Sequence, residues 1–272
     1  MCTIFGKLEE NGIMIGRSFD WVQLGGNICF VPSYRSYGVR TIGFCSVEQL
    51  GEDRPYEGMN EEGLFVGVTA IATRKGDDNC SCTLKIDSLG MVRYILERAK
   101  TVDDAMYIAN KFVVDYRSRY GVPKVQYFFA DTNNKIGIYE ENNFQENVTL
   151  QKGEYRVLTN MSVTSTNECI RRNKIRDILE KGSIVDDNSC MDIISEVRQK
   201  DLTAWSSVYN LNKKSFTLCI EQNYENKYEF SLEECLKKGR FSVDFAELKL
   251  NSRAMARKRH DGFYNLDMLG IE

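Results

Sequence analysis

The chain has 272 residues, of which 42% are hydrophobic and 28% charged, and its formal net charge is −3. This composition is typical of a globular protein with a sizeable core, and because no long run of charges of one sign stands out, a nucleic-acid or membrane-surface partner is not indicated. No apolar stretch reaches the ~18 residues that a transmembrane helix needs, and the N-terminus lacks the pattern of a signal peptide. We therefore expect a cytoplasmic protein that contacts neither nucleic acid nor membrane.

The first part of the chain predicts strands, because it consists of short runs rich in β-branched and aromatic residues with glycine and asparagine between them. These runs lie at 2–8, 12–21, 26–34, 40–47 and 63–72. The dipeptide Asn11-Gly12 favours a tight hairpin turn, so the first two strands should pair.

Helices and strands alternate in groups along the rest of the chain. Helical spacing and capping residues predict helices at 88–100, 101–116, about 165–182 and 190–200. Thr101 should cap the second of these helices, and Gly182 should end the third. Further strands are expected at 124–132, 135–142, 148–153, 155–160, 205–211, 215–223 and 227–232.

Runs of strands that alternate with runs of helices predict an α+β architecture rather than a parallel βαβ sheet. Two antiparallel sheets packed face to face, with helices outside both, would bury all the apolar strands. We therefore expect a four-layer αββα sandwich. Because no Ser/Gly/Pro-rich linker divides the chain, residues 1–272 should form one domain, with a core to about residue 235 and a tail over 236–272.

Nine cysteines and a single histidine limit the possible chemistry. An odd number of scattered cysteines indicates reduced thiols. Cys80 and Cys82 form a C-x-C without the second Cys/His pair of a zinc site, so we expect no metal and no cofactor. Conventional Cys–His or Ser–His–Asp catalysis would have to use His260, and a cysteine nucleophile here would otherwise need a different base.

Cys2 directly follows the initiator methionine. Removal of Met1 would leave Cys2 with a free α-amino group, whose ordinary pKa is about 7.7–8.0. Such an amine can accept the proton of its own thiol, as it does for N-terminal threonine nucleophiles, and no histidine is then needed. The alternative is that Cys2 is incidental, because position two must hold some residue.

Arg17 and Asp20, in GRSFDW at 16–21, return along the hairpin towards Cys2. A regular strand places residues three apart on opposite faces, so a bend or bulge would be needed to bring both to one site. A carboxylate beside an ammonium group tunes its pKa, and an arginine near a thiol favours the thiolate. The alternative is an ordinary surface ion pair, which contributes little.

Several segments in this order and spacing resemble the N-terminal-nucleophile hydrolases. They are MCT at the start, GRSFDW, GMNEEGLFVGV at 58–68, VLTN at 157–160, and a helix with two arginines shortly after it. The chain resembles in particular the choloylglycine hydrolase group, which includes bile salt hydrolases, penicillin V acylases and related linear-amide hydrolases. WSSVYNLNKKSFTL at 205–218 extends the resemblance to most of the chain.

This resemblance implies an amidase that hydrolyses a linear C–N bond through a thioester acyl-enzyme. Its substrate would be an N-acyl amino acid, a bile-salt-like conjugate or a related N-acyl amine. Cys2 would be the nucleophile with its α-amine as general base, Asp20 would hold that amine, and Arg17 would lie close to the thiol.

The later motifs imply the rest of the site. Asn160 would donate its side-chain amide to the oxyanion, a contact that is typically worth about 3 kcal/mol. Arg172 would be the second arginine, with Arg171 as the alternative, because the family pattern Ser-Arg-Phe-x-Arg is only partly kept here. The family's second oxyanion contact lies about ten residues after the asparagine of the MNEEGL-type motif. Counting from Asn60 reaches Ala70, where a backbone N–H would serve.

Two further features bear on assembly and substrate. Bile salt hydrolases carry a long insertion between LTN and the arginine helix, and its absence here favours a dimer over the family tetramer and argues against bile-salt specificity. An acyl pocket could be lined by apolar residues that could equally belong to the core, namely Trp21, Leu24, Phe65 and Ile71.

Two other functions stay open at this point. An acyltransferase similar to the acyl-coenzyme A:6-aminopenicillanate acyltransferases would share the acyl-enzyme. Those relatives are usually made as self-cleaving precursors, whereas a cysteine already at position two favours the hydrolase. A non-catalytic binding member would have a degenerate site, and the filled site positions disfavour it.

Overall fold

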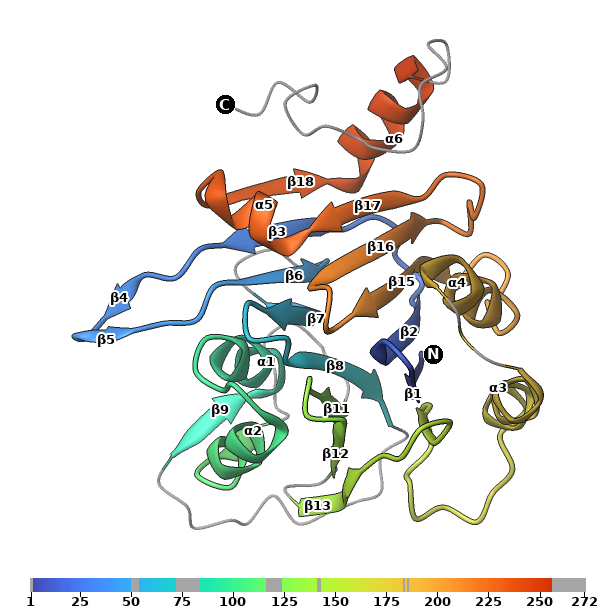
Figure 1. Cartoon of the computed structure of the whole chain (residues 1–272), viewed down its shortest axis with the longest axis horizontal. Coiled ribbons are helices and arrows are strands. Elements are labelled where there is room, and N and C mark those ends of the chain that lie inside the picture. The colour runs from blue at the N-terminus through green and yellow to red at the C-terminus, as the bar shows by residue number, and fades with distance from the viewer. Residues whose placement is uncertain are drawn as a thin grey trace.

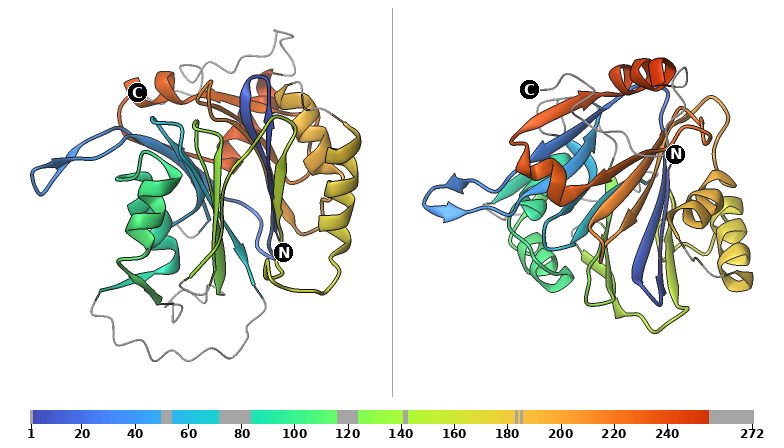
Figure 2. Two further views of the ribbon diagram at one scale, coloured as in Figure 1. Left: turned by 60° about the horizontal axis from the view of Figure 1, so that its bottom comes forward. Right: turned by 45° about the horizontal axis from the view of Figure 1, so that its top comes forward.

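A computed structural model of the chain describes residues 2–49, 54–71, 84–115, 124–140, 143–182, 184 and 186–255. These residues form two large antiparallel sheets that face each other, with helices on both outer faces (Figure 1). Figure 2 shows the layers edge-on, with the green helices on one side and the gold helices on the other. The expected α+β sandwich of four layers is confirmed.

The first sheet holds the N-terminal strand in its interior. Its strands are, in spatial order, β14 (Tyr155–Leu158), β1 (Thr3–Glu9), β2 (Gly12–Asp20), β15 (Thr203–Asn210), β16 (Ser215–Ile220) and β17 (Tyr228–Ser231). β1 and β2 form the expected hairpin, whose turn requires the left-handed backbone of Gly12. β1 therefore has one partner that is local in sequence and one from the second half of the chain.

The second sheet contains strands from a wider range of the chain. In spatial order they are β13 (Asn143–Thr149), β12 (Lys135–Glu140), β11 (Val125–Ala130), β8 (Phe65–Ala70), β7 (Pro55–Asn60), β6 (Phe44–Glu48), β3 (Asn27–Val31) and β18 (Phe241–Asp244). The sequence pattern does not predict β7, because a proline opens it and polar residues interrupt it.

The C-terminal segment differs from the expected tail. β18 pairs with β3 at the edge of the second sheet, and α5 (Leu232–Lys237) and α6 (Phe245–Met255) flank it. Val243 and Phe245 are buried in the core, which a four-residue strand does not reveal by periodicity. Two small elements complete the strands, a hairpin of β4 (Arg35–Ser36) and β5 (Val39–Arg40) and a parallel pair of β9 (Lys85–Asp87) and β10 (Val113–Asp115).

Four helices form the outer layers. α1 (Ser88–Leu96) and α2 (Val102–Ala109) contact the second sheet, whereas α3 (Ile170–Lys181) and α4 (Asp187–Ser195) contact the first. Thr101 forms a capping box with Asp104 at the start of α2, as expected, and α3 ends at Gly182. α3 begins later than predicted, after Cys169, and α4 begins earlier, because Asp186 forms its own capping box with Ser189.

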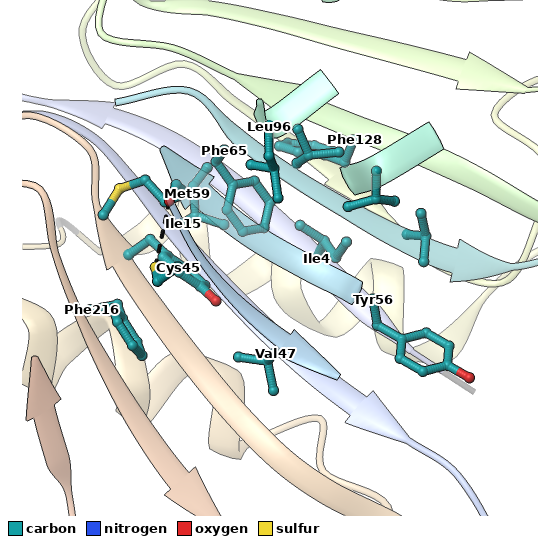
Figure 3. Close-up of a cluster of buried hydrophobic side chains, with 14 of the residues drawn as sticks. Ile4, Ile15, Cys45, Val47, Tyr56, Met59, Phe65, Leu96, Phe128 and Phe216 are labelled. Carbon is teal, nitrogen blue, oxygen red and sulfur yellow. Dashed lines mark hydrogen bonds between the residues drawn. The ribbon is translucent and has the colours of Figure 1, made fainter. Parts of the chain in front are cut away.

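Strand alternation divides the apolar residues between two cores. In β1, Ile4 belongs to the core between the sheets, whereas Phe5 packs beneath α3 and α4. Figure 3 shows Ile4, Ile15, Phe65 and Phe128 in the cluster between the sheets. The two sheets pack through this cluster. The start of β1 and the ends of β2 and β8 are therefore fixed relative to one another.

Candidate active site

Cys2 lies at the entrance to β1 and is 4% exposed. Its side chain belongs to the core between the sheets. In the hairpin, Ile4 lies opposite Arg17, so the alternation of the strand places Cys2 and Arg17 as diagonal neighbours on the same inner face. The structure thus brings Arg17 to the thiol side of Cys2, as the resemblance implies.

Asp20 lies on the opposite face of β2, because three residues along a regular strand reverse the side-chain direction. It accepts hydrogen bonds from Ser18 Oγ and Thr203 Oγ1, both at 2.6 Å, and from Gln199 Nε2 at 2.5 Å. The expected bend in β2 is absent from this strand. The register shift lies in its neighbour β15, between Thr203 and Trp205.

Asn160 contacts the backbone of Cys2 directly. Its side-chain oxygen lies 2.5 Å from the backbone nitrogen of Cys2 and also accepts from Arg171 Nη2 at 3.0 Å. Its side-chain nitrogen donates to the carbonyl of Ala70 at 2.7 Å. A primary amide has two N–H donors. Among the described residues one N–H of Asn160 has a partner, so the second can donate to another acceptor.

Arg171, in the first turn of α3, reaches three groups of the site. Its Nη1 donates to the carbonyl of Cys2 at 2.9 Å and to Thr3 Oγ1 at 3.0 Å, and it lies 3.5 Å from Asp20 Oδ2. Arg171 therefore links Asp20 on the outer face of the sheet to Asn160 and Cys2. Of the two candidate arginines, this is the one that the structure brings to Cys2.

Arg172 points elsewhere. Its Nη2 donates to the carbonyl of Asn167, and its side chain lines a cavity of about 620 Å³ between β13, β14 and α3. Thr159 and Met161, which flank Asn160 in the chain, line the same cavity. Consecutive helical residues project about 100° apart, so only one of the two arginines can face Cys2.

Ala70, at the end of β8, presents its backbone to Asn160. Ile71 donates its N–H to the carbonyl of Lys124, the residue immediately before β11. In an antiparallel ladder the adjacent residue then directs its N–H and C=O to the opposite side. The carbonyl of Ala70 accordingly accepts from Asn160, and its N–H points to the same side.

Asn60 is fully engaged away from Cys2. Its Nδ2 donates to the carbonyls of Leu96 and Ala99, at 3.1 and 2.7 Å, and its Oδ1 accepts from the amides of Glu62 and Leu64. These contacts hold the turn between β7 and β8 against the end of α1. In the structure, Asn60 thus marks the turn before β8 and is not in contact with the site.

A buried ion pair lies on the inner face beside Cys2. Arg17 Nε is 3.0 Å from Glu57 Oε2, and both side chains are 0% exposed. Glu57 Oε1 accepts from Trp205 Nε1 at 2.7 Å and from Ser207 Oγ at 2.9 Å. Arg17 Nη1 donates to the carbonyl of Tyr56, and its Nη2 has no hydrogen-bond partner among the described residues. Arg17 is therefore held in one position by these contacts, and the N–H groups of its Nη2 can still donate to another group.

Tyr56 also belongs to this inner face. Burial raises the pKa of its hydroxyl to about 12, and the electrostatic interaction with nearby Cys2 adds to the shift. Its ring packs 4.7 Å from that of Phe19. Tyr56 therefore stays neutral at physiological pH, and its ring packs against Phe19 and Trp205 on this face.

The four expected pocket residues are placed differently from one another. Phe65 is fully buried in the core, where its ring packs 4.9 Å from that of Tyr209, and Leu24 is 47% exposed. Trp21 is partly buried against the core, and Ile71 follows Ala70 at the end of β8. Of the four, Trp21 and Ile71 are next to site residues in the chain, and Phe65 belongs to the core (Figure 3).

Sequence reasoning did not single out Glu57, Gln199 or Thr203. A signal was available for Glu57, a carboxylate between Tyr56 and Met59 in a run that proved to be a strand. Gln199 and Thr203 carry no local signal, because their role follows from a bulge in β15 and a tertiary contact with Asp20.

Two further features concern metals and membranes. Among the described residues there is no group of three or more His, Cys, Asp and Glu that could hold a metal ion. None of the helices in the described part of the chain is long and apolar enough to cross a membrane. Cys80, Cys82 and His260, which the sequence singled out, lie outside the described residues.

The fold is that of the N-terminal-nucleophile hydrolases, as comparison with solved structures shows. Penicillin V acylase from Agrobacterium tumefaciens superposes with a TM-score of 0.64 at 14% identity, over 91% of this chain and 92% of that one. A variant of conjugated bile acid hydrolase from Clostridium perfringens gives 0.65 at 12% identity, over 90% and 96%. An N-acylethanolamine-hydrolyzing acid amidase ortholog from Caenorhabditis elegans gives 0.55 at 15% identity, over 78% and 93%.

The family follows from the sequence itself. The model of the acyl-coenzyme A:6-aminopenicillanic acid acyl-transferase family matches residues 8–181, and the chain belongs to this family. A comparison with curated proteins finds no match. The resemblance to choloylglycine hydrolase-like proteins is thereby confirmed at the level of fold and family.

Proposed function

We propose that the protein is an amidase that uses the thiol of Cys2 to hydrolyse the linear amide bond of an N-acyl amine. The main support for this proposal is that Asn160 and Arg171 both contact the backbone of Cys2, although they lie more than 150 positions after it in the sequence. A buried cysteine that served only the core would not need a side-chain amide and a guanidinium aimed at its main chain.

The first half of the proposed reaction forms a thioester. Once Met1 is removed, the α-amine of Cys2 takes the proton of the thiol, and the thiolate attacks the amide carbonyl carbon. The carbonyl oxygen becomes an oxyanion, which accepts from the second N–H of Asn160 and from the backbone N–H of Ala70. The protonated α-amine then gives its proton to the leaving nitrogen as the C–N bond breaks, which releases the amine.

The second half regenerates the enzyme. A water molecule attacks the thioester carbonyl and gives a proton to the α-amine, and the C–S bond breaks to release the carboxylic acid and the thiol. Because the same amine acts in both halves, no histidine is needed. Arg17 lies on the same face as the thiol, and its Nη2, which has no hydrogen-bond partner in the described part of the chain, is available as a donor to the sulfur in the proposed mechanism.

Asp20 and Arg171 set the electrostatics of the amine. Asp20 is a fully buried carboxylate that accepts from three neutral donors and lies next to Arg171. In the proposed mechanism the carboxylate of Asp20 favours the ammonium form of the α-amine, which donates to the leaving group. Arg171 fixes the carbonyl of Cys2, so the nucleophile and its base keep one orientation.

An acyltransferase is the second candidate, and the name of the matching family favours it. It would use the same thioester and differ only in the group that attacks it, an amine in place of water. The two activities are separated by adding a second amine to the reaction: a transferase forms the new amide, whereas a hydrolase releases free acid at an unchanged rate.

The test combines the intact mass of the protein with its rate of amine release. Purified protein from its native host should lack Met1, and iodoacetamide should add one carbamidomethyl group at Cys2. A panel of bile-salt conjugates, penicillin V, acyl-homoserine lactones, N-acyl amino acids and acylethanolamides should then reveal amine release. Cys2→Ser should abolish that release, and His260→Ala should not change it. Retention of Met1 in active protein would refute the mechanism, and loss of activity in His260→Ala would indicate a Cys–His enzyme.

A further inference from the structure

We infer that Gln126 and Thr69 are positioning residues for the oxyanion contact: together they fix the main chain of Asn160 from the opposite sheet. This inference rests on the proposed function of Asn160. Neither residue is part of the sequence motifs, and neither contacts Cys2 in the hydrogen bonds that the structure describes.

The main chain needs such support where Asn160 lies. Regular pairing of β14 with β1 ends at Leu158, opposite Ile4. Residues 159–161 that follow have no strand partner in the first sheet, and Thr159 is 1% exposed. A buried backbone carbonyl without a partner is costly, so these residues must find donors elsewhere.

The donors come from β11 and β8 of the second sheet. Gln126 Nε2 donates to the carbonyl of Thr159 and, at 3.3 Å, to that of Met161. Thr69 Oγ1 also donates to the carbonyl of Thr159, at 2.9 Å. One amide therefore contacts the carbonyls on both sides of Asn160.

The two residues form one unit. Gln126 and Thr69 lie directly opposite each other in the β11–β8 ladder, and Gln126 Nε2 is 2.9 Å from Thr69 Oγ1. Both side chains are fully buried. With their rotamers locked by packing and by each other, they can hold Asn160 with little freedom.

The next residue along β8 completes the arrangement. Ala70 follows Thr69 and accepts from Asn160 Nδ2. The same two-residue segment of the second sheet thus holds both the main chain and the side chain of Asn160. The direction of its second N–H, the proposed oxyanion donor, is set by the second sheet, whereas the nucleophile belongs to the first.

We call the Gln126–Thr69 pair, with its hydrogen bonds to the carbonyls of Thr159 and Met161, the clamp. Its chemistry predicts which substitutions should lower activity. Gln126→Met keeps the length of the side chain and removes the donor, and Thr69→Val removes only the hydroxyl, which Thr69→Ser restores. A shift of the oxyanion donor should lower kcat and leave KM nearly unchanged. We expect kcat to fall about ten- to hundredfold in Gln126→Met and Thr69→Val, with KM within about twofold, and Thr69→Ser to retain most activity.

Tyr127→Phe is the matched control. Tyr127 is the neighbour of Gln126 on β11, is equally buried, and donates through its hydroxyl to the carbonyl of Ser88 on the opposite face of the sheet. Its loss should destabilise the same strand without lowering kcat. An equal fall of kcat in Tyr127→Phe would mean that β11 matters only for stability.

A double-mutant cycle tests whether Gln126 acts through Asn160. If it does, Gln126→Met combined with Asn160→Ala should be no slower than Asn160→Ala alone. Losses that multiply would overturn the inference. If Gln126→Met fails to fold, the Thr69→Val and Thr69→Ser pair gives the same cycle.

A crystal structure separates this inference from the proposed function. The contacts of Asn160 with Cys2 and Ala70 should be present in the wild type and lost or lengthened in Gln126→Met. Retention of both contacts in the variant would overturn the clamp, whatever the enzyme hydrolyses. Conversely, a wild type that releases no amine from the panel would refute the proposed amidase and leave this structural readout intact.

Discussion

Arg171 donates to Asn160 Oδ1 at 3.0 Å and so fixes which end of that amide faces Cys2. A guanidinium cannot accept a hydrogen bond, so the oxygen of Asn160 must point to it and the nitrogen must point away. The nitrogen then meets the carbonyl of Ala70. The orientation of the proposed oxyanion donor is therefore set by charge as well as by packing.

Asn160→Ala should lower kcat by about 10²–10³ on any amide that the enzyme accepts, because one preorganised donor to the oxyanion is lost. KM should change little, since the ground-state carbonyl makes a weaker contact. Steady-state rates of amine release measure both values. An unchanged kcat would mean that the oxyanion lies elsewhere.

The two consecutive arginines should behave differently. Arg171→Met removes charge-assisted hydrogen bonds to Cys2 and Asn160, each worth about 1.5–3 kcal/mol, so kcat should fall at least about tenfold. Arg172→Met, its matched control one position along α3, removes a contact with the carbonyl of Asn167 and should leave kcat within about twofold. The reverse order of the two effects would restore Arg172 as the arginine of the site.

Glu57→Gln should destabilise the fold strongly. It leaves the fully buried charge of Arg17 without its counterion, and breaking a buried pair from one side typically costs about 3–5 kcal/mol. Urea denaturation followed by tryptophan fluorescence measures the loss, with the exposed Glu180→Gln as control. Removing the partner as well, in Glu57→Gln with Arg17→Met, should recover part of the stability. A single substitution that costs less than about 1 kcal/mol would contradict a tightly coupled pair.

Glu97 should contribute to the loss of stability in acid. Burial raises the pKa of its carboxyl, but hydrogen bonds and charge from Tyr34, Arg93 and Arg98 outweigh burial and lower it below the ordinary 4.5. The unfolded chain therefore binds a proton at Glu97 at a higher pH than the folded chain does. This stabilisation is complete above pH 4.5 and is lost as the pH falls through the folded pKa.

Glu97→Gln should accordingly lower the free energy of unfolding at neutral pH and reduce its dependence on pH below 4.5. Denaturation midpoints measured from pH 7 to pH 3 give both quantities. Parallel curves for the wild type and the variant would show that Glu97 titrates alike in the folded and unfolded chains.

Most of the layered fold could be predicted from the sequence, because the strands of the interior alternate and the helices carry local capping signals. Thr101 and Gly182 mark the ends of their helices as expected. β18 could not be predicted, because a four-residue strand at a sheet edge carries almost no periodic signal and is defined by its pairing with β3.

The sequence indicates which residues could form the candidate site, but not how all of them lie relative to one another. Cys2 and Arg17 share a face because a two-residue turn fixes their register, which the sequence indicates. Asp20 and Arg171 meet only because α3 packs on the outer face of the first sheet. Helical spacing cannot tell which of two consecutive arginines faces a sheet that lies elsewhere in the sequence.

The position of β1 between β2 and β14 has a consequence for the newly made chain. The hydrogen bond between Cys2 and Asn160 spans 158 positions, so the candidate site cannot form before the chain between these residues has been made. Contacts of this separation form late and slow the final folding step. Until then the backbone of Cys2 has neither the amide of Asn160 nor the guanidinium of Arg171 as a partner, so the candidate site is assembled only when the two halves of the first sheet come together.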